Sequence, residues 1–241
     1  MNQSSRFRFT SQWKSQAWQL SLLCGAACMV PLAGCGGSDH GGDAPVTVQP
    51  TTQRPTDSES SAKGGLTGKI KFKAGQGDTE FSVKPQDDGA KLVDSDEQEI
   101  ARFNLSDSKL KVKDADDTVL GYVIASPGKY KIKNSAQDVE LWQLQRQDDG
   151  DWKLEDGQEK LIYKIKKREY GFEIEDAAEK SMFKVKLKDG KTSLRDASEQ
   201  TVFYTKDEIA TVAVACLGLE AVDSLPLRTA LMTMLIIHDG R

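Results

Sequence analysis

A motif that recurs about every 20 residues constrains the fold of this chain more than any other feature. In each copy, an apolar residue is followed two positions later by Asp or Asn, as in Leu92 with Asp94 and Ile132 with Asn134. Self-similarity at a fixed period indicates a structure built from one repeated supersecondary unit. The apolar residue recurs at a spacing of 20 with one step of 22, and it falls at Leu92, Val112, Ile132, Leu154, Ile174 and Leu194.

Each copy of the motif is followed by a polar turn and a second apolar run, which together predict a β-hairpin. Residues 129–133 and 163–166 alternate polar and apolar side chains, as in a strand with one buried face. The Asp or Asn after the first strand suits a turn because its side chain bonds nearby backbone groups. Asp-Gly pairs at 88–89, 149–150, 156–157 and 189–190 indicate further turns. The second runs are Ile100–Leu105, Val119–Ile124, Val139–Leu144, Leu161–Ile165, Met182–Leu187 and Val202–Tyr204.

We therefore predict a mainly β domain over residues 66–206, made of hairpin repeats of about 20 residues. About 12–14 short antiparallel strands in series form a meander or a closed antiparallel β-barrel. Closure is favoured because it removes the exposed strand edges that promote aggregation.

Residues 207–241 lack this pattern and belong to the same domain as an apolar C-terminal helical segment. Residues 209–219 are apolar on every side, Thr205 or Asp207 can cap a helix there, and a second apolar stretch covers 225–237. A helix that is hydrophobic all round is buried or lies in a membrane. The first piece is too short to span a bilayer, which takes about 20 residues. We expect a buried helix in the barrel core, with a membrane-associated helix and a strand as alternatives.

The order of strands, the repeated turn after Leu or Ile, and the terminal apolar helix resemble the tubby-like superfamily. Its members include the tubby C-terminal domain, the phospholipid scramblases and the LURP-one-related proteins of plants. The resemblance covers about residues 66–238 and implies a barrel wrapped around a central hydrophobic helix. It includes no diagnostic motif, so no binding residue is carried over, and a shared fold does not fix a function.

The first 34 residues are typical of a secretory signal peptide. Three basic residues and no acidic residue precede an apolar run of 16 residues, 17–32, which is short for a transmembrane helix of about 20. The segment ends in Leu32-Ala33-Gly34-Cys35, which resembles the lipobox of bacterial lipoproteins. We predict cleavage between Gly34 and Cys35 and lipidation of Cys35, including a palmitate-type acyl chain, which anchors the chain in a membrane.

Residues 35–65 are predicted to be the lipidated cysteine and a disordered linker, because this segment has almost no large apolar residue. Gly36 stands where an Asp would favour inner-membrane retention in enteric-type lipoproteins. We therefore expect the non-cytoplasmic face of the cell envelope, and the outer membrane if the organism has one. Loss of the three basic residues of the signal takes the formal net charge from −4 to −7, which disfavours nucleic acid as a partner.

The residue types that carry common chemistry are sparse in the mature chain. Its two histidines, His40 and His238, lie in the linker and near the C-terminus. Cys216, the one cysteine left after cleavage and lipidation, lies in an apolar segment and is expected to be an inert core thiol. An acidic cluster at 114–117 suits a turn, with weak Ca²⁺ binding as the alternative. We predict no catalytic residue, no metal site and no cofactor.

One basic stretch is the candidate binding surface. If the repeats form adjacent hairpins, its members line up on one outer face, where anionic lipid headgroups or polysaccharide could bind. An ordinary barrel exterior is the alternative. The stretch comprises Lys164, Lys166, Lys167, Arg168, Lys184, Lys186 and Lys188.

The sequence thus predicts a non-enzymatic, membrane-anchored lipoprotein whose barrel binds lipid, another ligand or an envelope protein. A structural or assembly role in the envelope is the first alternative. A hydrolase that uses two carboxylates is the second, because acidic residues are abundant.

Overall fold

The computed structural model describes residues 66–239, which lie within one compact unit. The predicted signal peptide, Gly34, Cys35, His40 and the linker lie outside the described residues.

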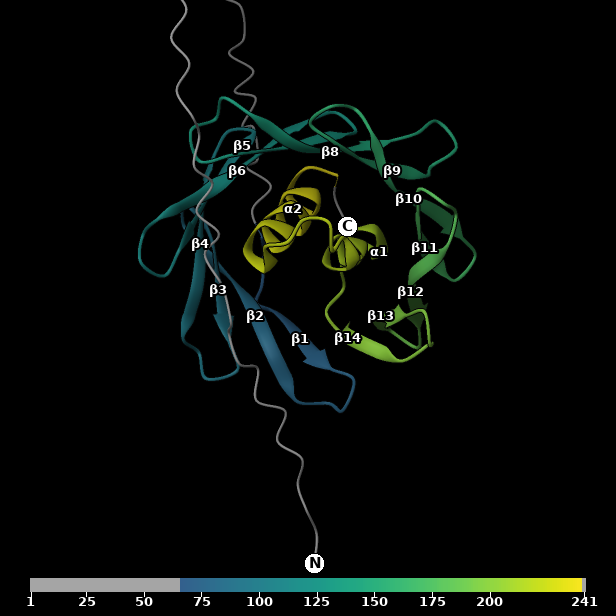
Figure 1. Ribbon diagram of the computed structural model, residues 1–241. Helices are drawn as coiled ribbons and strands as arrows, with labels where there is room; N and C mark the ends of the chain where they lie inside the picture. The colour runs from purple at the N-terminus through teal and green to yellow at the C-terminus, as the bar shows by residue number, and fades with distance from the viewer. Residues whose placement is uncertain (1–65, 240–241) are drawn as a thin grey trace, which may run out of the picture. The chain divides into compact units, whose positions relative to one another are not determined.

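Fourteen antiparallel strands form a closed barrel in which each strand pairs with its neighbours in sequence and β14 pairs with β1 (Figure 1). The predicted closed barrel of short strands is confirmed. The strands are β1 (Ile70–Ala74), β2 (Thr79–Gln86), β3 (Gly89–Asp94), β4 (Glu99–Ser106), β5 (Lys109–Asp114), β6 (Val119–Ser126), β7 (Lys129–Lys133), β8 (Glu140–Arg146), β9 (Trp152–Asp156), β10 (Leu161–Arg168), β11 (Gly171–Asp176), β12 (Ser181–Lys188), β13 (Lys191–Asp196) and β14 (Thr201–Thr205).

The repeated Asp closes the turn at one end of the barrel. In the β5–β6 turn, the Oδ1 atom of Asp114 accepts hydrogen bonds from the N–H groups of Asp116 and Thr118. Equivalent bonds form at Asp94, Asp156, Asp176 and Asp196. The third residue after each Asp or Asn has a left-handed backbone, with φ between 61° and 66°, and each of these hairpins contains a bulge. The motif therefore specifies a bulged turn.

The one spacing of 22 residues, between Ile132 and Leu154, results from one extra residue in each of two hairpins. Val112 pairs with Gly121 and Val123 with Ile132 in the regular part of the barrel. The next pairs are Ile132 with Trp142 and Leu144 with Leu154, so that each hairpin is one residue longer. The alternation of buried and outward side chains is therefore kept.

The apolar residue of every repeat points into the barrel and is at most 1% exposed. Two helices, α1 (Thr211–Ala215) and α2 (Leu225–His238), lie inside the ring of strands, with a 3₁₀ turn at Cys216–Gly218 (Figure 1). Strand and helix side chains form one hydrophobic cluster. The predicted buried C-terminal helix is confirmed, and no helix within residues 66–239 has the length and apolarity needed to cross a bilayer.

The longer helix is formed by the second apolar stretch, as α2, and not by residues 209–219. Residues 209–219 contain the five-residue α1 and the 3₁₀ turn, and Ala210 at the start of α1 offers no side-chain cap. Neither Thr205 nor Asp207 caps it, because the Asp207 carboxylate accepts instead from the N–H of Lys71 and from the Thr205 hydroxyl. Ser224 caps the longer helix α2 by accepting from the N–H of Leu227, and Pro226 lies in its first turn.

Candidate functional site

The barrel places six of the seven predicted basic residues on its outer face. Side chains at 164, 166 and 168 alternate with the buried Tyr163 and Ile165, and those at 184, 186 and 188 alternate with the buried Phe183 and Val185. Lys167 follows Lys166 directly, so its side chain lies on the other side of the strand. It pairs with Phe172 near the end of β10. It therefore does not share the face of the other six.

Glutamates from β11 and the following turn neutralise the half of this stretch on β10. The Lys164 ammonium lies 2.8 Å from Glu179, and that of Lys166 lies 2.8 Å from Glu175. Arg168 contacts Glu173 at 3.1 Å and Glu175 at 3.5 Å. The hydrogen bond to Glu175 raises the pKa of Lys166. This wall is charge-paired and offers little free positive charge to a ligand.

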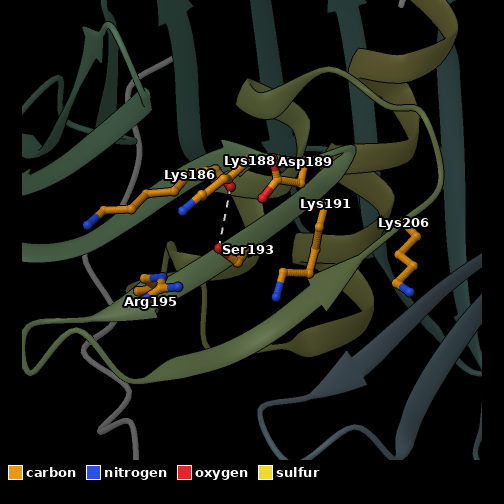
Figure 2. Close-up of a pocket in the computed structure, with 7 residues that line it drawn as sticks. All are labelled: Lys186, Lys188, Asp189, Lys191, Ser193, Arg195 and Lys206. Carbon is orange, nitrogen blue, oxygen red and sulfur yellow. Dashed lines mark hydrogen bonds between the residues drawn. The ribbon is translucent and has the colours of Figure 1, made fainter.

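A cationic depression of about 460 Å³ lies beside it, lined by β12, β13 and the residue after β14 (Figure 2). Five basic side chains surround one carboxylate and one hydroxyl. We use the name cationic depression for this set: Lys186, Lys188, Asp189, Lys191, Ser193, Arg195 and Lys206.

Three of these lysines have no acidic partner in the described part of the chain. The ion pairs formed within residues 66–239 do not include Lys188, Lys191 or Lys206. Arg195 donates from Nη1 to the backbone oxygen of Glu199 at 3.1 Å and forms no ion pair there either. Unlike the β10 wall, the depression therefore keeps an excess of positive charge.

Local contacts hold several of these side chains in place. The Lys191 ammonium lies 5.1 Å from the ring centre of Tyr204, a cation–π distance. Ser193 is buried, and its hydroxyl donates to the backbone oxygen of Lys186 at 3.3 Å, as the dashed line in Figure 2 shows. The Lys186 ammonium lies 5.5 Å from the ring centre of Tyr170.

Glu199 borders the cationic depression and forms an ion pair with one of its lysines, Lys186. Its carboxylate lies 2.7 Å from Lys184 and 2.6 Å from Lys186. Hydrogen bonds from Lys184 and then Lys186 lower the pKa of Glu199 to about 2. At neutral pH, this carboxylate is ionised and offsets part of the charge of Lys186.

Sequence reasoning found Lys186 and Lys188 but missed Lys191, Arg195 and Lys206. The missed signal is a change of residue type at equivalent positions of two repeats. The outward residues of β11 are Glu173 and Glu175, whereas those of β13, twenty residues later, are Ser193 and Arg195. The loss of two carboxylates between neighbouring repeats is visible in the sequence, although the contribution of Lys206 depends on how the barrel closes.

The contacts of Cys216 and of the acidic cluster at 114–117 are those of residues that support the fold. Cys216 is buried, its thiol lies 3.8 Å from the backbone oxygen of Val212, and burial raises its pKa. Asp114 forms the turn described above, and Asp117 pairs with Lys113. No group of three or more His, Cys, Asp or Glu side chains suited to a metal ion occurs among residues 66–239.

Comparisons with known proteins leave the family open. No family model and no curated protein matches the chain. A crystal structure of a protein from Arabidopsis thaliana is similar at 10% identity, covering 67% of this chain and 94% of that one, with a TM-score of 0.36. A TM-score this low carries no argument about fold or function. The lipobox and the tubby-like resemblance stay predictions.

Proposed function

We propose that this protein is a non-enzymatic binding module of the cell envelope, tethered by a lipid on Cys35, whose barrel binds an anionic group in the cationic depression. The observation that carries the proposal is the positive charge of Lys188, Lys191 and Lys206, which form no ion pair within residues 66–239. Phosphate or sulfate esters, as found in lipid headgroups and envelope polysaccharides, supply the complementary chemistry.

The bore of the barrel is less suited to a ligand than the outer face. Its lining residues and α2 share one hydrophobic cluster, and Ala230, Leu231 and Met232 of α2 are fully buried. A ligand in the bore would have to displace this helix, at the cost of its buried apolar surface. The outer face binds without any such rearrangement.

Titration of the protein with inorganic pyrophosphate, followed by the amide NMR spectrum, tests the proposal. We expect chemical-shift changes clustered in β12, β13 and residue 206, and their loss in the double variant K188E/K191E. The matched control is K111E/K160E, which makes the same change of charge at two lysines that form no ion pair within residues 66–239. Changes scattered over the whole barrel, or equal responses of the two double variants, would show that the depression is not the site.

A further inference from the structure

We propose that the barrel docks with one end on an anionic lipid bilayer. This inference rests on the proposed anion binding and adds the partner and the orientation. The docking end is defined as the end that holds the first described residue, Leu66, the end of β14 and the β12–β13 turn.

Backbone pairing and side-chain contacts place these three features together. Thr192 pairs with Thr205, so the β12–β13 turn adjoins the end of β14. The Lys71 N–H donates to the Asp207 carboxylate at 2.7 Å, and a shallow depression is lined by both Leu66 and Asp207. The chain therefore enters the barrel next to Lys206, which belongs to the cationic depression.

An exposed leucine extends the docking end beyond the lysines. Among residues 66–239, the large apolar side chains that are exposed are Leu187, at 55%, and Val139, at 49%. Leu187 lies at the end of β12 between Lys186 and Lys188, whereas Val139 lies at the opposite end, in the turn between β7 and β8. Leu187 has the parity of the inward Val185, so its side chain lies at the rim of the barrel and not on the outer face with Lys186 and Lys188. An apolar side chain at a rim that also carries lysines suits the boundary between headgroups and acyl chains.

The distribution of charge favours the docking end over the opposite end, and the β12–β14 side over the rest of the docking end. The opposite end carries the repeated turns with exposed acids that form no ion pair within residues 66–239, such as Asp96, Asp116 and Glu159, which an anionic surface repels. At the docking end, the short turns after β2 and β4 carry the exposed Asp88 and Asp107. Exposed lysines lie at the ends of β10, β12 and β14, namely Lys167, Lys188 and Lys206, next to the exposed Glu169, Asp189 and Glu208. Lys191 of the cationic depression, which forms no ion pair within residues 66–239, adds a further positive charge on the β12–β14 side. Docking is therefore tilted, with the β12–β14 side against the bilayer.

The tether argues for a bilayer rather than a soluble anion. Between the proposed lipid on Cys35 and Leu66 there are 30 residues, and a random-coil chain of that many residues has an end-to-end distance of about 30 Å. A tether of this length keeps the docking end close to the membrane and raises its effective concentration there. Each lysine near an anionic surface then contributes about a fivefold gain in binding.

Fluorescence quenching by nitroxide lipids tests the orientation. The protein extracted from its membrane is labelled at a thiol introduced by Leu187→Cys or, as the control, by Val139→Cys; Cys216 is buried and does not compete for the label. The protein is then reconstituted into vesicles of phosphatidylglycerol and phosphatidylcholine. We expect quenching at position 187 and not at 139, and its loss in vesicles of phosphatidylcholine alone.

Charge-reversal variants test whether docking depends on the lysines of the cationic depression. K188E/K191E should lower the ratio of docked to undocked protein by about 25-fold or more, while K111E/K160E leaves it unchanged. Equal quenching at positions 187 and 139, or quenching that does not depend on phosphatidylglycerol, would overturn the inference. If pyrophosphate still shifts the amides of β12 and β13 in that case, the proposed anion site stands and only the bilayer is wrong as its partner.

Discussion

Glu199 sets part of the charge of the cationic depression from a turn on its border. It has a left-handed backbone, with φ of 61°, and its carboxylate contacts both Lys184 and Lys186. Five of the six equivalent turn positions hold an acid, and most of these acids pair with a basic side chain. The residue that follows the structural Asp or Asn by three is therefore one of the positions, together with strand glutamates such as Glu175, that neutralise lysines of the outer face.

Replacing this carboxylate by its neutral amide should strengthen anion binding. In Glu199→Gln, Lys184 and Lys186 lose their acidic partner, so we expect pyrophosphate to bind about two- to fivefold more tightly at neutral pH, measured by isothermal titration calorimetry. The control is Glu179→Gln, which frees Lys164 outside the depression. Unchanged or weaker binding by Glu199→Gln would contradict this role.

The same ion pairs predict a dependence of stability on pH. The pKa of Glu199 falls from 4.5 in the unfolded chain to about 2 in the barrel, so its ionised form stabilises the fold above about pH 4.5. That contribution is lost as the pH falls from about 4.5 toward 2. The difference in thermal stability between the wild-type protein and Glu199→Gln should shrink over this range.

At the scale of elements, the strands could be predicted from the sequence because each repeat carries its own turn. The Asp side chain, the left-handed third residue and the alternating apolar positions act within about 20 residues, without help from distant parts of the chain. The sequence did not show which of the two apolar segments forms the longer helix, because both segments are buried and hydrophobic periodicity does not distinguish them. Ser224 caps the longer helix α2, whereas α1 has no side-chain cap.

Gly121 lies where the backbone of β7 and a side chain of α2 both approach β6 closely. A Cβ atom at this position would lie 2.5 Å from the backbone oxygen of Lys133 on β7 and 3.3 Å from Leu227 Cδ2 on α2. We expect Gly121→Ala to lower the free energy of unfolding by about 1–3 kcal/mol, measured by urea denaturation, because backbone must move. Gly68→Ala is the control, since its Cβ meets no atom within 4 Å and should change stability by under about 0.5 kcal/mol. Equal stability of both variants would refute the close packing.

At the scale of the whole molecule, closure of the barrel creates the candidate site. Pairing of β14 with β1 fixes the chain after β14, and Lys206 thereby joins the side chains of β12 and β13. The sequence predicts a basic stretch on β10 and β12. It does not show that Glu173 and Glu175 neutralise the β10 half of this stretch, because that pairing depends on the register of the strands. The free positive charge lies one strand further on.

The central claim is that a lipid-tethered barrel holds an anionic ligand in the cationic depression. Native mass spectrometry of the protein extracted from its own membranes tests it most directly. We predict a chain that begins at an acylated Cys35 and carries a phosphate- or sulfate-bearing ligand, which the K188E/K191E variant largely loses and the K111E/K160E variant keeps. A chain without the acyl group, or an equal amount of ligand on both double variants, would contradict the account.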